Sequence, residues 1–125
     1  MGLKKKILYL ITQDWYYVSH RESLSLHAKQ QNYDVTLVTQ VGEYGELISR
    51  TGVNLIPIKF YRSVKNIFHE FLTIKQIYKA YQKTNPDIIH QVSIKPCFYG
   101  AIAIYFDACK EKRPIVINDF TGIGF

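Results

Sequence analysis

The sequence predicts an α/β domain in which a mainly parallel sheet of about five strands carries helices on both faces. Three observations predict this fold: apolar runs of strand length recur along the chain, helical patterns separate them, and the connections are short. Parallel neighbours need a crossover of helix length, and strands covered on both faces are apolar throughout rather than alternating. The expected arrangement is one three-layer domain that fills residues 1–125.

Each expected strand is an apolar run bounded by turn residues. The first, KILYLIT, is apolar almost throughout, which is typical of a strand buried on both faces. The segment NPDIIHQV opens with a turn and continues as a strand, and RPIVIND repeats this arrangement near the end of the chain. The five strands are expected at residues 6–12, 34–39, 53–58, 85–92 and 113–119.

The helices are predicted from apolar periodicity and from signals at their ends. The first is expected at residues 18–31, with Ser19 as the N-cap of a capping box. A short helix separates the second and third strands. The longest helix covers residues 64–83, where apolar side chains keep the 3.6-residue period. Pro96 is expected to open the last helix, which continues to about residue 110.

Length and hydropathy limit the class of protein. A chain of 125 residues is long enough to bury a core without disulfides or metals. The longest apolar run, residues 97–106, is shorter than the roughly 18 residues that span a membrane. The basic start MGLKKKILYL has no small-residue cleavage site after its apolar run. We therefore expect a cytoplasmic protein.

The cysteines, the histidines and the net charge limit the kinds of ligand that the domain is expected to bind. Cys97 and Cys109 are expected on one helix, about 18 Å apart along its axis, and therefore as free thiols. His20 and His27 would lie about 10 Å apart along a helix, too far to bind one metal ion, and there is no Cys-x-x-Cys pair. No Gly-rich Walker or dinucleotide fingerprint follows the first strand, so neither a metal nor a cofactor is expected in this domain. The formal charge of +6 indicates an anionic neighbour, and the absence of a reader motif disfavours nucleic acid.

Three polar segments follow predicted strands. In parallel α/β sheets, ligands bind beyond the carboxyl ends of the strands, near the point where the strand order reverses. QDWYYVSHR follows the first strand, QVSIKP ends the fourth, and NDFTGIGF ends the fifth. We expect these segments, residues 13–21, 91–96 and 118–125, to converge on one ligand site.

The same segments carry a resemblance to a known family. Its most specific pieces are DWYYVSHR and the spacing H-x-x-x-x-K-P-x-x-Y-G, which begins at His90 and ends at Gly100; VTLVTQVGEYGELI and VINDFTGIGF agree with them. In this order, the motifs look like the N-terminal half of a bacterial glycosyltransferase of family 4, which has the GT-B architecture of Rossmann-like domains. The resemblance implies that this half binds the acceptor, and that a second half binds the nucleotide-sugar donor.

The resemblance also implies a function. Such enzymes are hexosyltransferase-like and build polysaccharides, capsular ones included, or lipid-linked glycans. We expect a parent enzyme that moves a sugar from a nucleotide-sugar to a sugar or lipid-phosphate acceptor in surface glycan biosynthesis. The donor-binding half would be supplied in cis or in trans, and this chain alone would be inactive because the groups that stabilise the leaving diphosphate belong to that half. The alternative is a noncatalytic subunit or anion-binding module that pairs with a separate donor-binding chain.

The candidate site residues come from the three segments. Asp14 and His20 are the candidates for a catalytic role; turn formation and capping are their structural alternatives. We expect the dipole of the first helix to keep His20 uncharged. Lys95, at a helix start, suits a phosphate, and at least one aromatic after the first strand is expected in the core. The expected acceptor-binding residues are Asp14, Trp15, Tyr16, Ser19, His20, Arg21, His90, Ser93, Lys95, Asn118, Asp119 and Thr121.

The longest helix offers a second surface. Its lysines fall within an arc of about 80° beside an apolar stripe that includes Phe68 and Leu72. A basic face beside exposed aromatic residues suits an anionic membrane surface, whereas an ordinary solvated helix face is the simpler alternative. The lysines concerned are Lys65, Lys75, Lys79 and Lys83.

Overall fold

The protein is a single parallel sheet with helices on both faces. The structure, a computed structural model, describes residues 4–61, 67–106, 108–110 and 112–120. Within them, all paired strands run parallel in the order β3-β2-β1-β4-β5. The strands are β1 (Lys6–Gln13), β2 (Asp34–Gln40), β3 (Asn54–Pro57), β4 (Ile88–Val92) and β5 (Ile115–Asp119). The five-stranded parallel sheet predicted from the sequence is confirmed.

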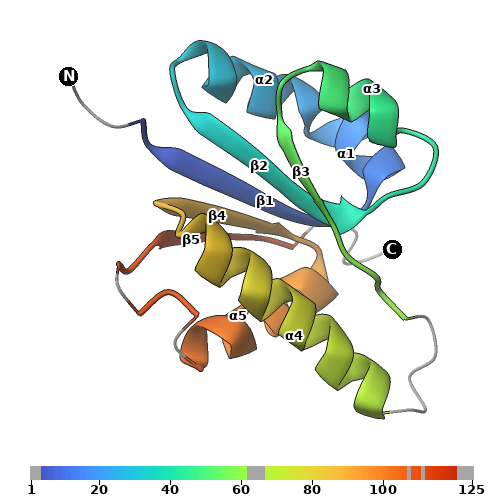
Figure 1. Cartoon of the computed structure of the whole chain (residues 1–125), viewed down its shortest axis with the longest axis vertical. Coiled ribbons are helices and arrows are strands. Elements are labelled where there is room, and N and C mark those ends of the chain that lie inside the picture. Colours follow the sequence, from blue (N-terminus) through green and yellow to red (C-terminus); the bar gives the residue numbers. More distant parts are fainter. Residues whose placement is uncertain (1–3, 62–66, 107, 111, 121–125) are drawn as a thin grey trace.

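The helices form two outer layers around this sheet (Figure 1). One layer packs Tyr17 and Ile48 onto the sheet, and the other packs Ile77, Tyr81 and Tyr99 onto its opposite face. The first layer consists of α1 (Asp14–His20), α2 (Glu22–Gln30) and α3 (Gly45–Arg50). The second consists of α4 (Ile67–Thr84) and α5 (Ile94–Tyr105). These layers give the Rossmann-like three-layer fold that the sequence predicts.

The first predicted helix is two helices in the structure. α1 begins at Asp14, directly after β1, and the chain breaks at Arg21, whose backbone is not helical (φ −128°, ψ −10°). Ser19 is therefore in the last turn of α1, and the predicted capping box with Glu22 does not form. The sequence signal failed because Asp14 starts the helix through contacts with a distant loop, described below.

The last predicted helix is also displaced. α5 begins at Ile94, two residues before Pro96, and ends at Tyr105 rather than near residue 110. The chain then folds back, and the amide of Ala108 donates to the carbonyl of Ala103 (3.1 Å). This turn buries Cys109 in the core outside the helix, so the predicted shared helix for the two cysteines is wrong, although both are free thiols.

β5 forms an exposed edge of the sheet. Its side chains are exposed along the strand, because neither helical layer extends over this edge.

Some predictions concern residues that the structure does not describe. Lys65 and the start of the predicted long helix lie outside the described residues, as does Thr121. In the part of the chain that the structure describes, no helix combines the length and the hydropathy of a membrane span.

Candidate functional site

The sheet order defines where a ligand site belongs. The order β3-β2-β1-β4-β5 reverses between β1 and β4, so the crevice typical of such sheets lies beyond the carboxyl ends of these two strands. We call this side of the sheet the carboxyl edge. All three predicted segments follow strands that are neighbours there, because β1 pairs with β4 and β4 pairs with β5.

Asp119 is the residue at which the three segments meet. Its Oδ2 accepts from the guanidinium of Arg21 (2.5 Å) and lies 3.3 Å from Nε2 of His90. Its carbonyl accepts from the amide of Ser93 (2.8 Å). Residues from the first, second and third predicted segments are thus held together by one aspartate at the end of β5.

The environment of Asp119 favours its carboxylate form. Partial burial raises the pKa of Asp119, but hydrogen bonds and charge from Arg21 and His90 outweigh burial and leave this pKa below its usual value. The ring of His90 stacks on that of Tyr9, with centroids 5.2 Å apart. Burial also raises the pKa of Tyr9 to about 12, so its hydroxyl stays protonated. Two contacts therefore hold His90: its ring stacks on Tyr9, and its Nε2 lies against Asp119.

Asp14 anchors a neighbouring loop. Its side chain is buried, and Oδ2 accepts from the backbone amides of Gly42 (2.6 Å) and Tyr44 (2.9 Å) in the β2–α3 loop. A Cβ at Gly42 would lie 3.2 Å from Oδ1 of the same carboxylate, so the close approach suits glycine. A carboxylate in the first turn of a helix is also favoured by the helix dipole. These contacts explain why α1 begins at Asp14.

The aromatic residues of α1 divide between core and surface. Tyr17 is fully buried and its hydroxyl pairs with that of Ser25, so at least one of the three is a core residue, as predicted. Trp15 is 51% exposed. Tyr16 stacks on His20, with ring centroids 4.2 Å apart. Trp15 and the Tyr16–His20 stack thus present aromatic surface next to the carboxyl edge.

His20 does not occupy the position predicted for it. It lies in the last turn of α1, so the positive end of the helix dipole is at Asp14 and not at His20. The predicted position of His20 in the first turn of a helix is therefore wrong. Ser19 and His20 are both exposed, so the structure leaves their side chains accessible to a ligand.

The β4–α5 turn has an unusual backbone at Ser93. Its φ of 81° and ψ of 164° lie in a region that non-glycine residues rarely adopt, at a cost of about 1–3 kcal/mol. Backbone strain of this kind concentrates at functional sites. Ser93 is half-buried, and Lys95 is exposed in the first turn of α5. The turn thus places a cationic side chain and the free amides of a helix start at the carboxyl edge.

Gln91 is a site residue that the sequence reasoning missed. It is fully buried; Nε2 donates to Oδ1 of Asn118 (2.6 Å), and Oε1 accepts from the hydroxyl of Tyr81 (2.7 Å). A Cβ at Gly100 would lie 1.8 Å from this Oε1. Glycine at position 100 therefore leaves room for the buried side chain of Gln91, which fixes Asn118 at the carboxyl edge.

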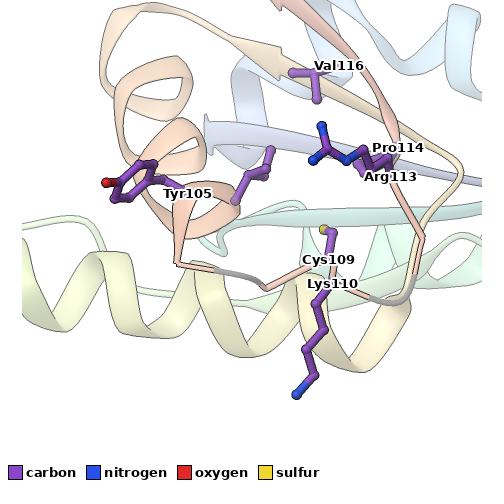
Figure 2. A pocket seen from close by; sticks show the side chains of 7 residues that line it. Tyr105, Cys109, Lys110, Arg113, Pro114 and Val116 are labelled. Atoms are coloured by element: carbon purple, nitrogen blue, oxygen red, sulfur yellow. The ribbon is translucent and has the colours of Figure 1, made fainter.

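A cavity of about 450 Å³ lies away from this site (Figure 2). Its lining includes Arg113 and Val116, at the amino end of β5 and hence on the opposite edge of the sheet. Figure 2 shows the side chains of Tyr105 and Lys110 pointing away from the space beside Cys109. Because the cavity lies at the edge of the sheet opposite the three segments, we do not assign it to the site. Among the described residues, no three His, Cys, Asp or Glu side chains are grouped to hold a metal ion.

The five parallel strands between two helical layers define a class of fold, the Rossmann-like α/β domain. The sequence pattern of the family described as Glycosyl transferase 4-like matches residues 6–118. The chain therefore belongs to the glycosyl transferase 4-like family. No curated protein is similar enough to this chain to count as a match.

Solved structures agree on the fold. The glycosyltransferase from Rickettsia africae ESF-5 superposes with a TM-score of 0.71 at 17% identity, over 94% of this chain and 30% of that one. CalG4, the calicheamicin glycosyltransferase, gives 0.63 at 12% identity, over 94% and 33%. MurG from Acinetobacter baumannii gives 0.61 at 11% identity, over 91% and 34%. The chain thus spans about a third of the length of these structures.

Proposed function

We propose that this chain is the acceptor-binding half of a hexosyltransferase-like enzyme that moves a sugar from a nucleotide-sugar to a lipid-linked or polysaccharide acceptor in surface glycan biosynthesis. The observation that carries the proposal is the meeting of the three segments at Asp119, through Arg21 and Ser93. One site built from three neighbouring strand ends is what a ligand in the crevice of this fold requires. Family membership gives the reaction class.

The exposed groups at the carboxyl edge suggest how an acceptor would bind. Lys95 and the free amides of the first turn of α5 suit a phosphate or diphosphate. Trp15 offers a ring face on which a sugar can stack. Arg21, His90 and Asp119 hold these segments in place, and the proposed acceptor contacts of Tyr16, Ser19, Asn118 and Thr121 complete the set predicted from the sequence.

The two catalytic candidates, Asp14 and His20, have different surroundings in the structure. In the proposed transfer, an acceptor oxygen attacks the anomeric carbon of the donor, the bond to the nucleotide diphosphate breaks, and the acceptor proton goes to a base. Asp14 is buried and already accepts two backbone hydrogen bonds, whereas His20 is exposed. We therefore favour His20 over Asp14 as the base, since a base must reach the proton that it removes.

In this proposal, the residues that bind the nucleotide-sugar donor belong to a second half of the enzyme. The nucleotide-sugar and the groups that stabilise its diphosphate would come from a donor-binding half, joined to this chain or separate. The chain alone is then expected to bind acceptor without turnover. Its expected place is the cytoplasmic face of the membrane, where a lipid-linked acceptor would be met.

Fluorescence of the single tryptophan tests acceptor binding, because Trp15 lies at the proposed site. A water-soluble, short-chain polyprenyl diphosphate should change the emission saturably, and the matching polyprenol without phosphate should not. Lys95→Ala should weaken binding by about tenfold, which corresponds to one charge-assisted contact. Lys110→Ala removes another exposed lysine, near the opposite edge, and should leave the affinity unchanged. Equal effects of the two substitutions would contradict the proposed site.

A further inference from the structure

Two hydrogen bonds connect the core of the domain with the carboxyl edge. The hydroxyl of Tyr81 donates to Oε1 of Gln91 (2.7 Å), and Nε2 of Gln91 donates to Oδ1 of Asn118 (2.6 Å). Tyr81 and Gln91 are fully buried, whereas Asn118 is exposed. These hydrogen bonds therefore begin on α4 in the core and end at the surface of the candidate site. We call Tyr81, Gln91 and Asn118 the amide network.

Tyr81 sets the direction of both hydrogen bonds. Burial raises the pKa of Tyr81 well above its usual value, so its hydroxyl keeps its proton. A buried hydroxyl proton without an acceptor is costly, and Gln91 is the one hydrogen-bond partner of this hydroxyl among the residues that the structure describes. The hydroxyl therefore donates, and the atom of Gln91 that faces it must be the amide oxygen.

The orientation of Gln91 determines that of Asn118. Because its oxygen faces Tyr81, Gln91 turns its NH2 group toward Asn118, and an NH2 group can only donate. The partner atom must then be the oxygen of Asn118. The NH2 group of Asn118 lies on the other side of its amide and has no hydrogen-bond partner among the described residues. Asn118 therefore presents N–H groups, and not an oxygen, at the carboxyl edge.

Asn118 faces the helical layer that contains Lys95. Neighbouring residues of a strand point to opposite faces of the sheet, so Asn118 and Asp119 face different layers. Asp119 pairs with Arg21, between α1 and α2, whereas the glutamine that binds Asn118 lies directly beside Gly100 of α5. The layer that Asn118 faces therefore also supplies the ammonium of Lys95 and the free amides at the start of α5.

We infer that the amide network holds Asn118 as a hydrogen-bond donor for a phosphate oxygen of the acceptor. In this role Asn118 selects the ligand, and Gln91 and Tyr81 are positioning residues. The outward N–H groups, the ammonium of Lys95 and the amides of the first turn of α5 all complement an oxygen that carries negative charge. The inference deepens the proposed function and rests on it for the identity of the ligand. The orientation of Asn118 does not depend on that function, since Tyr81 sets it from the core.

Exchange of side-chain amide protons with water tests the orientation without any ligand. In a nitrogen–proton correlation spectrum of the isotope-labelled chain, the NH2 group of Gln91 should exchange slowly because it is buried and donates to Asn118. The NH2 group of Asn118 should exchange fast, because it faces solvent, and its signals should shift when the short-chain polyprenyl diphosphate is added. A slowly exchanging NH2 group at Asn118 in the free protein would overturn the inference.

Tyr81→Phe removes the hydroxyl that sets the direction. Either orientation of Gln91 then leaves one of its amide groups unpaired, so the donor form of Asn118 should be about half populated. We expect slower exchange at the Asn118 amide and about twofold weaker binding of the polyprenyl diphosphate. Tyr99→Phe is the matched control, because it removes another hydroxyl between α4 and α5, the one that donates to Glu70, and should change neither quantity. Equal effects of the two substitutions would overturn the inference.

Asn118→Asp tests the contact with the ligand. The carboxylate still accepts from Gln91, but a negatively charged oxygen replaces the outward N–H groups. The affinity for the polyprenyl diphosphate, followed by the fluorescence of Trp15, should fall at least about tenfold. Asn54→Asp adds the same charge at the exposed first residue of β3, on the opposite edge, and should leave the affinity unchanged. Full affinity in Asn118→Asp would overturn the inference.

The two proposals fail separately. Saturable diphosphate binding that is insensitive to Asn118→Asp would overturn the inference and leave the proposed acceptor site intact. A wild-type chain that binds no diphosphate would overturn the acceptor site, and with it the ligand assigned to Asn118, whatever the exchange pattern of its amide. Far-UV circular dichroism and urea denaturation check that each variant is folded under the conditions of the titration.

Discussion

Arg21 and Asp119 form an ion pair of 2.5 Å although 98 positions separate them in the sequence. Arg21 lies at the break between α1 and α2, and Asp119 ends β5. The pair is mostly shielded, with side-chain exposures of 16% and 25%. It therefore joins the first and last segments of the candidate site from opposite ends of the chain, on the side of the sheet where β1, β4 and β5 end.

Loss of this ion pair should destabilise the fold measurably. Arg21→Ala leaves a half-buried carboxylate with one fewer partner, and we expect a loss of about 1–2 kcal/mol in the free energy of unfolding. Urea denaturation measures this change. Arg50→Ala is the matched control, because it breaks an equally short but exposed pair with Glu46 and should cost under about 0.5 kcal/mol. Equal costs would show that the Arg21 pair does not join the segments.

The same aspartate predicts a pH dependence. The pKa of Asp119 is lowered in the folded protein from its ordinary value of 3.8, so the unfolded chain binds more protons in acid. The ion pair therefore stabilises the fold fully above that value, and its contribution is lost as the pH falls through the lower folded pKa. Asp119→Asn should be destabilising at neutral pH, and its difference from the wild type should shrink in acid. Chemical denaturation across this pH range measures both; a difference independent of pH would contradict the assignment.

Asp14 should behave as a loop anchor. Asp14→Ala removes the acceptor of two backbone amides, and we expect a loss of about 2–4 kcal/mol together with faster hydrogen exchange at Gly42 and Tyr44. Asp34→Ala is the control, because Asp34 accepts from the exposed side chain of Asn54 and should cost less than about 1 kcal/mol. Unchanged exchange at the two amides would contradict this role.

Gly100 should not tolerate a side chain. Gly100→Ala places a methyl group against Gln91 and Tyr81, and we expect a loss of about 1–3 kcal/mol from overpacking. Replacing Gln91 by serine should relieve part of that cost. A double-mutant cycle of Gly100→Ala and Gln91→Ser therefore should show a favourable coupling. Additive effects would mean that the alanine is accommodated elsewhere.

The sheet was predictable because its information is local. Each strand is a short apolar run, as in KILYLIT, and the helical patterns between the runs supply the crossovers that parallel strands need. The positions of the three polar segments at one edge follow from the parallel direction alone. The burial of one of the aromatics after β1 was predictable for a similar reason, since a helix packed on a sheet needs a large side chain there.

The errors arose where distant contacts decide local structure. The start of α1 depends on amides of the β2–α3 loop, about 30 positions from Asp14. Ser19 and Glu22 resemble a helix start in the sequence. In the structure, α1 begins five residues earlier, at Asp14, because of the contacts of Asp14 with that loop. Gln91 was missed for the same reason: its partners, Tyr81 and Asn118, are fixed only when β4 lies beside β5.

Chemical-shift mapping shows whether the three segments form one ligand site. The isotope-labelled chain would be titrated with the short-chain polyprenyl diphosphate, and amide shifts would be followed on both edges of the sheet. We predict the largest shifts at Trp15, Ser93 and Lys95, all with one dissociation constant, because the three segments form one site. Shifts confined to Lys110 and Arg113 near the opposite edge, or independent titrations in the separate segments, would contradict it.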